Sequence, residues 1–71
     1  MKTKYRFIEF VQPEDRDFWC CYNRKKGDEL GSVEWCGPWK KWIFCVDEDA
    51  VFSADCLDDI SHFMKQLPKT P

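Results

Sequence analysis

The sequence predicts an α+β fold in which a four-stranded antiparallel meander packs on one C-terminal helix. Four short segments with the alternating or wholly apolar character of strands occupy the first two thirds of the chain. Links rich in Gly, Pro, Asn and Asp separate them, and after residue 53 the apolar spacing changes from every second residue to every third or fourth. The length of 71 residues fits one small domain, residues 1–71.

The first strand is expected at about residues 5–11. Ile8 and Phe10 alternate there with Tyr5 and Phe7, so each pair would lie on its own side of the strand. A proline and a run of charged residues follow and end this strand. The same polar run forms the link to the second strand.

The second and third strands are expected at about residues 18–23 and 30–35, joined as a hairpin. The second is a short aromatic and apolar run, FWCCYN, and turn-forming Asn, Gly and Asp occupy the link at 23–28. In the third strand apolar and polar residues alternate, and Gly31 indicates a bulge.

The fourth strand and the helix complete the predicted fold. A tight turn at 36–39 leads into the most apolar strand, at about residues 41–46. Ser53 is placed to cap a helix at about residues 54–67, which Pro68 ends. The apolar positions of this helix recur at spacings of three and four: Cys56, Leu57, Ile60, Phe63, Met64 and Leu67.

The size of the helix relative to the sheet predicts that apolar surface stays exposed. A helix of about fourteen residues is ~20 Å long and ~10 Å wide, whereas four strands at ~4.8 Å spacing are some 15 Å or more across. One helix therefore covers one side incompletely, although the strands carry large apolar groups on both sides. The surplus favours a docking surface for a protein partner or a second copy. The alternative is that loops and sheet curvature hide it.

Two clusters, one of tryptophans with lysines and one of basic residues alone, are candidates for a binding surface, and we expect them at neighbouring positions of the meander, where together they combine rings with cations. The candidate binding residues are Trp39, Lys40, Lys41, Trp42, Arg24, Lys25 and Lys26. Rings that stack on bases, with cations beside phosphates, are how sheet surfaces hold single-stranded nucleic acid. The net charge of -2 argues against a surface that is basic overall. The alternative is that the tryptophans pack in the core and the lysines protect a sheet edge.

The sequence contains no pattern typical of catalysis, metal binding or cofactor binding. It has no C-x-x-C pair, and Cys20 and Cys21 are strand neighbours whose thiols point to opposite sides. The single histidine, His62, lies on the expected polar side of the helix four residues after Asp58, where a solvated surface pair is the simpler interpretation. We therefore expect no enzyme activity, no catalytic or metal-binding residue and no cofactor.

The cysteines and the hydropathy pattern indicate a cellular compartment. The odd number of cysteines, five, and the lack of a signal-peptide pattern favour free thiols under reducing conditions. No stretch approaches the ~20 apolar residues of a membrane helix. We expect a cytoplasmic protein that does not enter a membrane.

Three stretches of the chain form a distinctive pattern: LGSVEW at 30–35, PWK at 38–40 and VFSADCLDDI at 51–60. The pattern, L-G-x-V-x-W, P-W-K and V-F-S-x-x-C-L-x-D-I, resembles that of a group of short uncharacterised proteins encoded in tailed phages and prophages. The likeness extends over about residues 19–67. The resemblance implies a phage or prophage accessory protein, and it carries over no activity and no site residue.

These observations predict a non-enzymatic accessory binding module that acts through an aromatic sheet surface on a protein partner or on a second copy of itself. The alternative function is single-stranded nucleic-acid binding through the hairpin surface rich in Trp and Lys. No motif of the chain identifies the partner.

Overall fold

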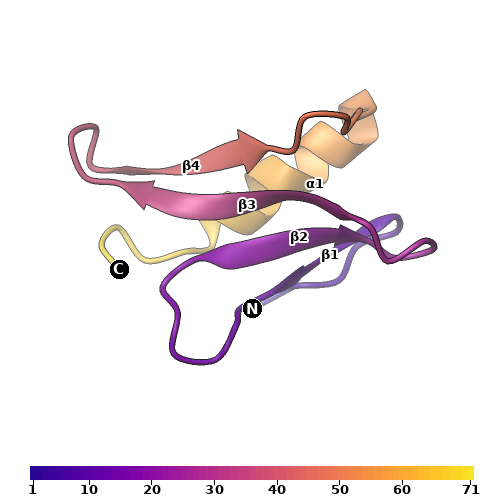
Figure 1. The fold of residues 1–71 in the computed structure, drawn as a ribbon. Helices are drawn as coiled ribbons and strands as arrows, with labels where there is room; N and C mark the ends of the chain where they lie inside the picture. The colour runs from indigo at the N-terminus through magenta and orange to yellow at the C-terminus, as the bar shows by residue number, and fades with distance from the viewer.

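The computed structural model describes all of residues 1–71 and contains one sheet and one helix (Figure 1). The sheet is antiparallel with its strands in the spatial order β1-β2-β3-β4, which is also their order in the chain. The elements are β1 (Ile8–Val11), β2 (Trp19–Asn23), β3 (Glu29–Cys36), β4 (Lys41–Val46) and α1 (Ala54–Lys65). The predicted α+β meander with one C-terminal helix is confirmed.

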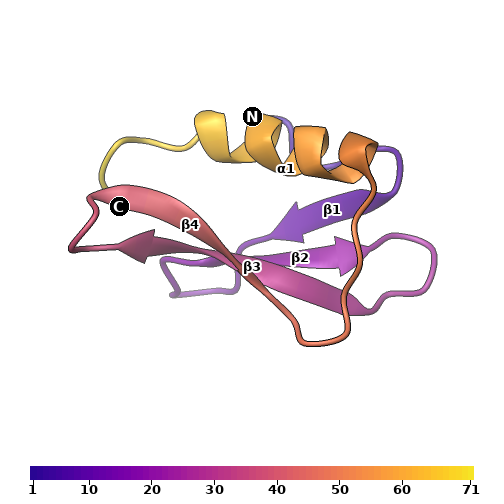
Figure 2. The same cartoon turned by 90° about the horizontal axis from the view of Figure 1, so that it is seen from above.

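Strand pairing assigns each residue of the sheet to one side, because cross-strand partners point the same way. The side that faces α1, called the helix side, carries Ile8, Phe10, Trp19, Cys21, Gly31, Val33, Trp35, Trp42, Phe44 and Val46. The other, called the open side, carries Glu9, Val11, Cys20, Tyr22, Ser32, Glu34, Cys36, Lys41, Ile43 and Cys45. Figure 2 shows α1 on one side of the sheet and no second layer on the other.

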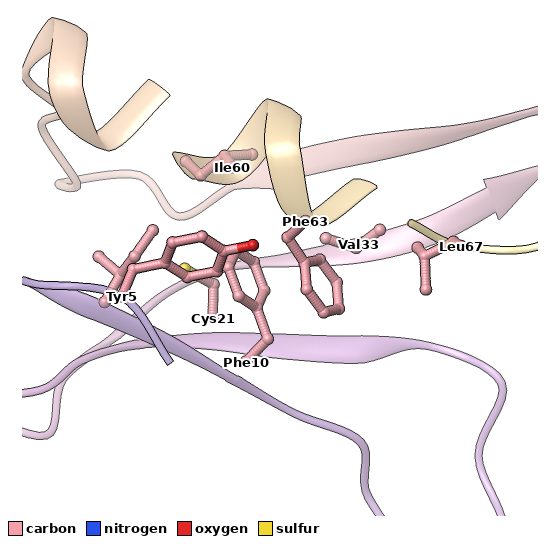
Figure 3. Packing of buried hydrophobic residues seen from close by; sticks show 8 residues of the cluster. Tyr5, Phe10, Cys21, Val33, Ile60, Phe63 and Leu67 are labelled. Carbon is pink, nitrogen blue, oxygen red and sulfur yellow. The ribbon is translucent and has the colours of Figure 1, made fainter. Parts of the chain in front are cut away.

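An aromatic contact between α1 and the first two strands forms the centre of the core. The ring of Phe63 stacks on Phe10, with centroids 3.9 Å apart and planes at 1°, and meets the edge of Trp19 at 5.1 Å. Figure 3 shows Phe63 and Phe10 between the helix and the sheet. The buried cluster consists of Tyr5, Ile8, Phe10, Cys21, Val33, Ile60, Phe63 and Leu67.

The strand β1 begins at Ile8 instead of at residue 5, so the prediction was wrong by three residues at this end. The chain bends before it: the Tyr5 N–H donates to the Ile8 carbonyl at 2.9 Å, and the Phe10 N–H donates to the Thr3 carbonyl at 2.8 Å. Tyr5 consequently leaves the strand pattern and enters the core, where its ring meets the edge of Phe10 at 6.0 Å. The alternation of residues 5–11 therefore reflected a tight bend followed by a strand.

The helix begins where the sequence predicted and ends two residues earlier. Ser53 caps it, because its hydroxyl accepts a hydrogen bond from the Cys56 N–H at 3.2 Å. At the other end Gln66 and Leu67 donate to carbonyls three residues back, which is the tighter 3₁₀ geometry. Pro68 explains this early end, because a proline disfavours helical backbone at the residue before it.

The predicted irregularity near Gly31 is present. Cys21 pairs with Gly31 while Tyr22 pairs with Glu29, so Leu30 is an extra residue in β3. A Cβ atom at Gly31 would lie 2.7 Å from the Phe44 ring and would also collide with the Cys45 carbonyl. Glycine is therefore required here because the neighbouring strand and its ring occupy the space.

We predict that Gly31→Ala lowers the free energy of unfolding by roughly 1–3 kcal/mol, the usual effect of overpacking a close contact. Gly37→Ala is the matched control, because a Cβ at Gly37 has nothing within 4 Å. Urea denaturation of both variants measures the difference. Equal stability of the two variants, or stabilisation by Gly31→Ala, would contradict the proposed close approach.

Candidate functional site

A groove opens on the helix side of the sheet between α1 and the beginning of β4. The helix is held toward the other half of the sheet, because Phe63 packs on Phe10 of β1 and Trp19 of β2. The space between α1 and β4 has a volume of about 600 Å³. It is called the α1–β4 groove, and its lining residues are Lys40, Lys41, Trp42, Leu57, Ile60, Ser61, Met64, Lys65, Leu67 and Lys69.

The inner surface of the α1–β4 groove is apolar. Ile60 and Leu67 are buried beneath it, Met64 is half-buried, and Leu57 is 53% exposed. Leu57 shares the helical spacing of the apolar positions, yet the structure leaves more than half of it accessible. Farther along β4, Phe52 from the link before α1 packs edge-on against Phe44 at 5.6 Å. The groove is therefore restricted to the beginning of the strand.

The rim of the α1–β4 groove is cationic. Lys40 and Lys41 lie at its β4 side, and Lys65 and Lys69 come from the end of α1 and the segment after it. No Asp or Glu lines the groove, although acidic residues outnumber basic ones in the chain, 13 to 11. An anionic group bound here would therefore meet only favourable charges within the lining.

The turn between β3 and β4 places the predicted Trp-Lys-Lys-Trp run at this groove. The Lys40 N–H donates to the Gly37 carbonyl at 3.1 Å, and Lys40 has the left-handed backbone angle φ 52°. The structure brings Lys40, Lys41 and Trp42 into the groove lining. Trp39 lies outside the lining and projects from the turn with 69% of its surface exposed.

Trp42 lines the groove and is fixed by two contacts. Its indole N–H donates to the Pro68 carbonyl at 2.6 Å, and its ring meets Trp35 edge-on at 5.5 Å. This hydrogen bond fastens the segment after α1 to β4. Lys69, the next residue along, is consequently held at the rim.

The basic residues Arg24, Lys25 and Lys26 do not join this site. Their turn links β2 to β3, whereas the turn that bears Trp39 links β3 to β4, so the two turns lie at opposite ends of β3 (Figure 1). At ~3.3 Å per residue the eight residues of β3 separate them by roughly 26 Å. The expectation that the two clusters are neighbours was wrong, because successive hairpins of a meander turn at alternate ends.

Hydrogen bonds give the second cluster a structural role. The Arg24 guanidinium donates to the Tyr5 carbonyl at 2.7 Å, and its backbone N–H donates to the Phe7 carbonyl at 2.9 Å. The N–H groups of Lys25 and Lys26 donate to the Asn23 side-chain oxygen. Arg24 thus holds the bend before β1 against the β2–β3 turn.

The open side of the sheet is less aromatic than the sequence led us to expect. The tryptophans of the strands all lie on the helix side. On the open side the only ring within a strand is half-buried Tyr22, and Val11 is 46% exposed. The aromatic surplus is therefore concentrated beneath and beside α1, where it borders the groove.

The thiols of Cys20, Cys21 and Cys45 are not activated. Cys20 and Cys21 point to opposite sides of β2, as predicted, and all the cysteines are free. Burial, with a smaller contribution from Cys56, raises the pKa of Cys21 to about 12. Burial also raises the pKa of Cys20 and of Cys45. These thiols are protonated at neutral pH, which is the unreactive form.

No group of three or more His, Cys, Asp or Glu side chains is arranged to hold a metal ion.

His62 makes a structural contact with the N-terminal segment. Its Nδ1 lies 2.7 Å from the Tyr5 hydroxyl, which also accepts a hydrogen bond from the Gln66 amide at 3.3 Å. The same Gln66 amide exchanges two hydrogen bonds with the Lys2 backbone, each 2.8 Å. The predicted surface pair with Asp58 is therefore replaced by a contact that fastens residues 2–5 to α1.

Sequence reasoning missed Leu57, Met64, Lys65 and Lys69 as site residues. Leu57 and Met64 share the helical spacing of the core positions, which concealed their exposure. The feature of the sequence that could have revealed this exposed surface was the small width of one helix relative to four strands. A lysine in the last helical turn and another just after it were also consistent with capping.

We predict that the buried thiol of Cys21 makes stability fall at alkaline pH. Below its ordinary pKa of 9.0 the thiol is protonated in both the folded and the unfolded chain. Above that pH the unfolded chain loses the proton while the folded chain, with its pKa near 12, keeps it, so the free energy of unfolding decreases. Between pH 8 and pH 10 the decrease is about 1 kcal/mol.

Urea denaturation at several pH values measures this decrease, and Cys21→Ala is the comparison. The variant is expected to be less stable at every pH and to lose less stability between pH 8 and pH 10. Cys20 and Cys45 are retained in both proteins, so their effects cancel. Parallel pH profiles for the two proteins would show that Cys21 does not titrate in this way.

Two further findings bear on function. The helix of the structure lacks the length and apolar character that crossing a membrane demands. Comparison of the chain with models of known protein families, with curated proteins and with solved structures finds no match. A functional proposal therefore depends on the residues of the molecule itself, and above all on those of the α1–β4 groove.

Proposed function

We propose that the protein is a non-enzymatic binding module whose α1–β4 groove holds an apolar, acidic segment of a partner protein. The observation that carries the proposal is the composition of the lining: aliphatic side chains and Trp42 inside, four lysines at the rim, and no carboxylate. Such a groove matches a segment that combines apolar side chains with Asp or Glu.

The apolar lining supplies a driving force for association. Leu57 is more than half exposed and Met64 is half-buried, so both lose water contact when a partner side chain enters. Burial of apolar surface contributes about 25 cal/mol per Å². Methionine also adapts its shape to different apolar groups, which suits a recognition surface.

The lysines favour an acidic partner over other proteins. Each exposed ion pair contributes only about 0.2–1 kcal/mol, so the charges matter more for the rate of encounter and for rejection of cationic segments than for total affinity. A second copy of this chain would bring the same four lysines to the contact if it docked groove to groove. Like charges would then oppose each other, so a different, acidic protein is the better partner.

Single-stranded nucleic acid would also find cations here, but the rings are poorly placed for it. Stacking requires exposed ring faces. Trp39 is exposed, whereas Trp42 is hydrogen-bonded to Pro68 and contacts Trp35. The second basic cluster lies at the far end of β3 and does not extend the cationic surface. The aliphatic lining of the groove suits peptide side chains better than bases.

The proposed setting is the cytoplasm of a bacterium that carries a phage or prophage. The resemblance of about residues 19–67 to short proteins encoded in phages and prophages supports this setting, as do five free cysteines, which persist where thiols stay reduced. An accessory module of this kind would act by occupying a segment of another protein. It would not need catalytic residues.

We predict that peptides selected from a displayed library of random 12-residue sequences are rich in Asp, Glu and large apolar residues and poor in Lys and Arg. Fluorescence anisotropy of a labelled selected peptide measures its affinity. Leu57→Asp places a carboxylate inside the groove and is expected to weaken binding at least tenfold. Val51→Asp is the matched control, because Val51 is 87% exposed and lies outside the groove lining.

The same variants distinguish the alternative function. Failure of the selection, or peptides that bind Leu57→Asp and Val51→Asp equally well, would contradict the proposed groove function. A labelled oligo(dT) strand that binds more tightly than the best peptide, and releases as salt is added, would favour the nucleic-acid function instead.

A further inference from the structure

We propose that the partner segment binds in an extended conformation as a fifth strand alongside β4, with side chains at its end next to Trp42 entering the α1–β4 groove. This inference rests on the proposed function and specifies the conformation of the segment. It follows from three features: an uncovered sheet edge, free backbone groups along that edge, and a groove beside the same strand.

The two edges of the sheet differ in how they are covered. At β1 the N-terminal segment lies along the edge, where Lys4 pairs with Glu9 and the Thr3 carbonyl accepts a hydrogen bond from the Phe10 N–H. At the other edge β4 pairs only with β3. One edge is therefore capped by the chain itself, and the other is free to accept a strand.

The pattern of hydrogen bonds identifies the free backbone groups of β4. The Asp47 N–H donates to the Leu30 carbonyl at 3.0 Å, directly across from it in the register of β3 and β4. In an antiparallel pair, residues with their hydrogen bonds directed to the partner strand alternate with residues directed away. Counting back from Asp47, the N–H and C=O groups of Trp42, Phe44 and Val46 point away from β3, toward the unpaired edge of the sheet.

No other part of the chain uses these groups. None of the backbone hydrogen bonds in turns, loops and caps involves Trp42, Phe44 or Val46. An exposed row of unpaired N–H and C=O groups is a template for another strand. Strand addition would satisfy them with the partner's backbone, which gives affinity that does not depend on the partner's sequence.

The side chains of β4 do little to block an incoming strand. Charged residues or prolines within an edge strand usually prevent pairing. After Lys41, β4 continues as Trp-Ile-Phe-Cys-Val, with no charge and no proline. Val46 at its end is 57% exposed. The strand thus lacks the features that keep other edges unpaired.

The groove lies where a fifth strand would place its side chains. A strand beside β4 would lie ~4.8 Å from it and direct every second side chain toward the helix side. There it would meet Leu57, Met64 and Lys65 of α1. Apolar side chains opposite the beginning of β4 would enter the groove, and acidic residues at that end of the segment would reach the lysine rim. The expected occupant is therefore an extended acidic segment with apolar residues at every second position.

A scan of backbone N-methylation in the selected peptide of highest affinity tests this inference. Methylation at one residue at a time removes one N–H while the side chain stays. We expect binding to weaken at least tenfold at every second residue of the central part and to change little at the residues between. Hydrogen exchange measured by NMR is expected to slow at least tenfold for the amides of Trp42, Phe44 and Val46, with Val51 unchanged.

The outcomes separate the inference from the proposed function. Strand addition would be overturned if Leu57→Asp weakens binding of the peptide, but the N-methylation scan shows no two-residue period and the β4 amides gain no protection from exchange. The groove function would then still stand. If no selected peptide responds to Leu57→Asp, both fail. Protection of the Trp42, Phe44 and Val46 amides in the free protein when it is dimeric would assign the edge to a second copy, and would also overturn the inference.

Discussion

The stack of Phe63 on Phe10 is the contact on which the rest of the structure depends. This stack joins the only helix to the edge strand β1. Trp19 of β2 makes an edge contact with the same Phe63 ring. A helix of twelve residues that is anchored there cannot also cover β4. The α1–β4 groove is therefore a consequence of where the core forms, and it needs no movement of the chain to open.

The two edges of the molecule reflect the same asymmetry. The N-terminal segment covers β1 and is fastened to α1 through Tyr5, His62 and Gln66. The last residues of the chain are fastened to β4 by the Trp42 indole, which donates to the Pro68 carbonyl. Polar contacts thus stabilise one edge of the sheet. The other keeps an apolar strand, a groove and four lysines within reach of a partner.

Local patterns predicted most of the fold, because they depend on near neighbours in the chain. Alternation placed Ile8 and Phe10 on one side of the first strand, and the Ser53 cap and Pro68 located the ends of α1 to within two residues. The bend at Tyr5 escaped prediction because two backbone hydrogen bonds, from Tyr5 to the Ile8 carbonyl and from Phe10 to the Thr3 carbonyl, outweigh the apolar alternation.

The site was predicted only in part, since the position of a helix across a sheet is decided by packing between distant residues. Lys40, Lys41 and Trp42 were identified from composition, whereas Leu57 and Lys65 could be recognised only once α1 was placed.

A nuclear Overhauser spectrum of the free protein in solution tests the placement of α1 most directly. We expect strong cross-peaks from the Phe63 ring to Phe10 and Trp19, together with a Leu57 side chain that lacks cross-peaks to Phe44 and is broadened by a soluble paramagnetic agent. Cross-peaks from Leu57 to Phe44, with Leu57 protected from that agent, would place α1 over β4. The groove would then be closed, and the central claim would be wrong.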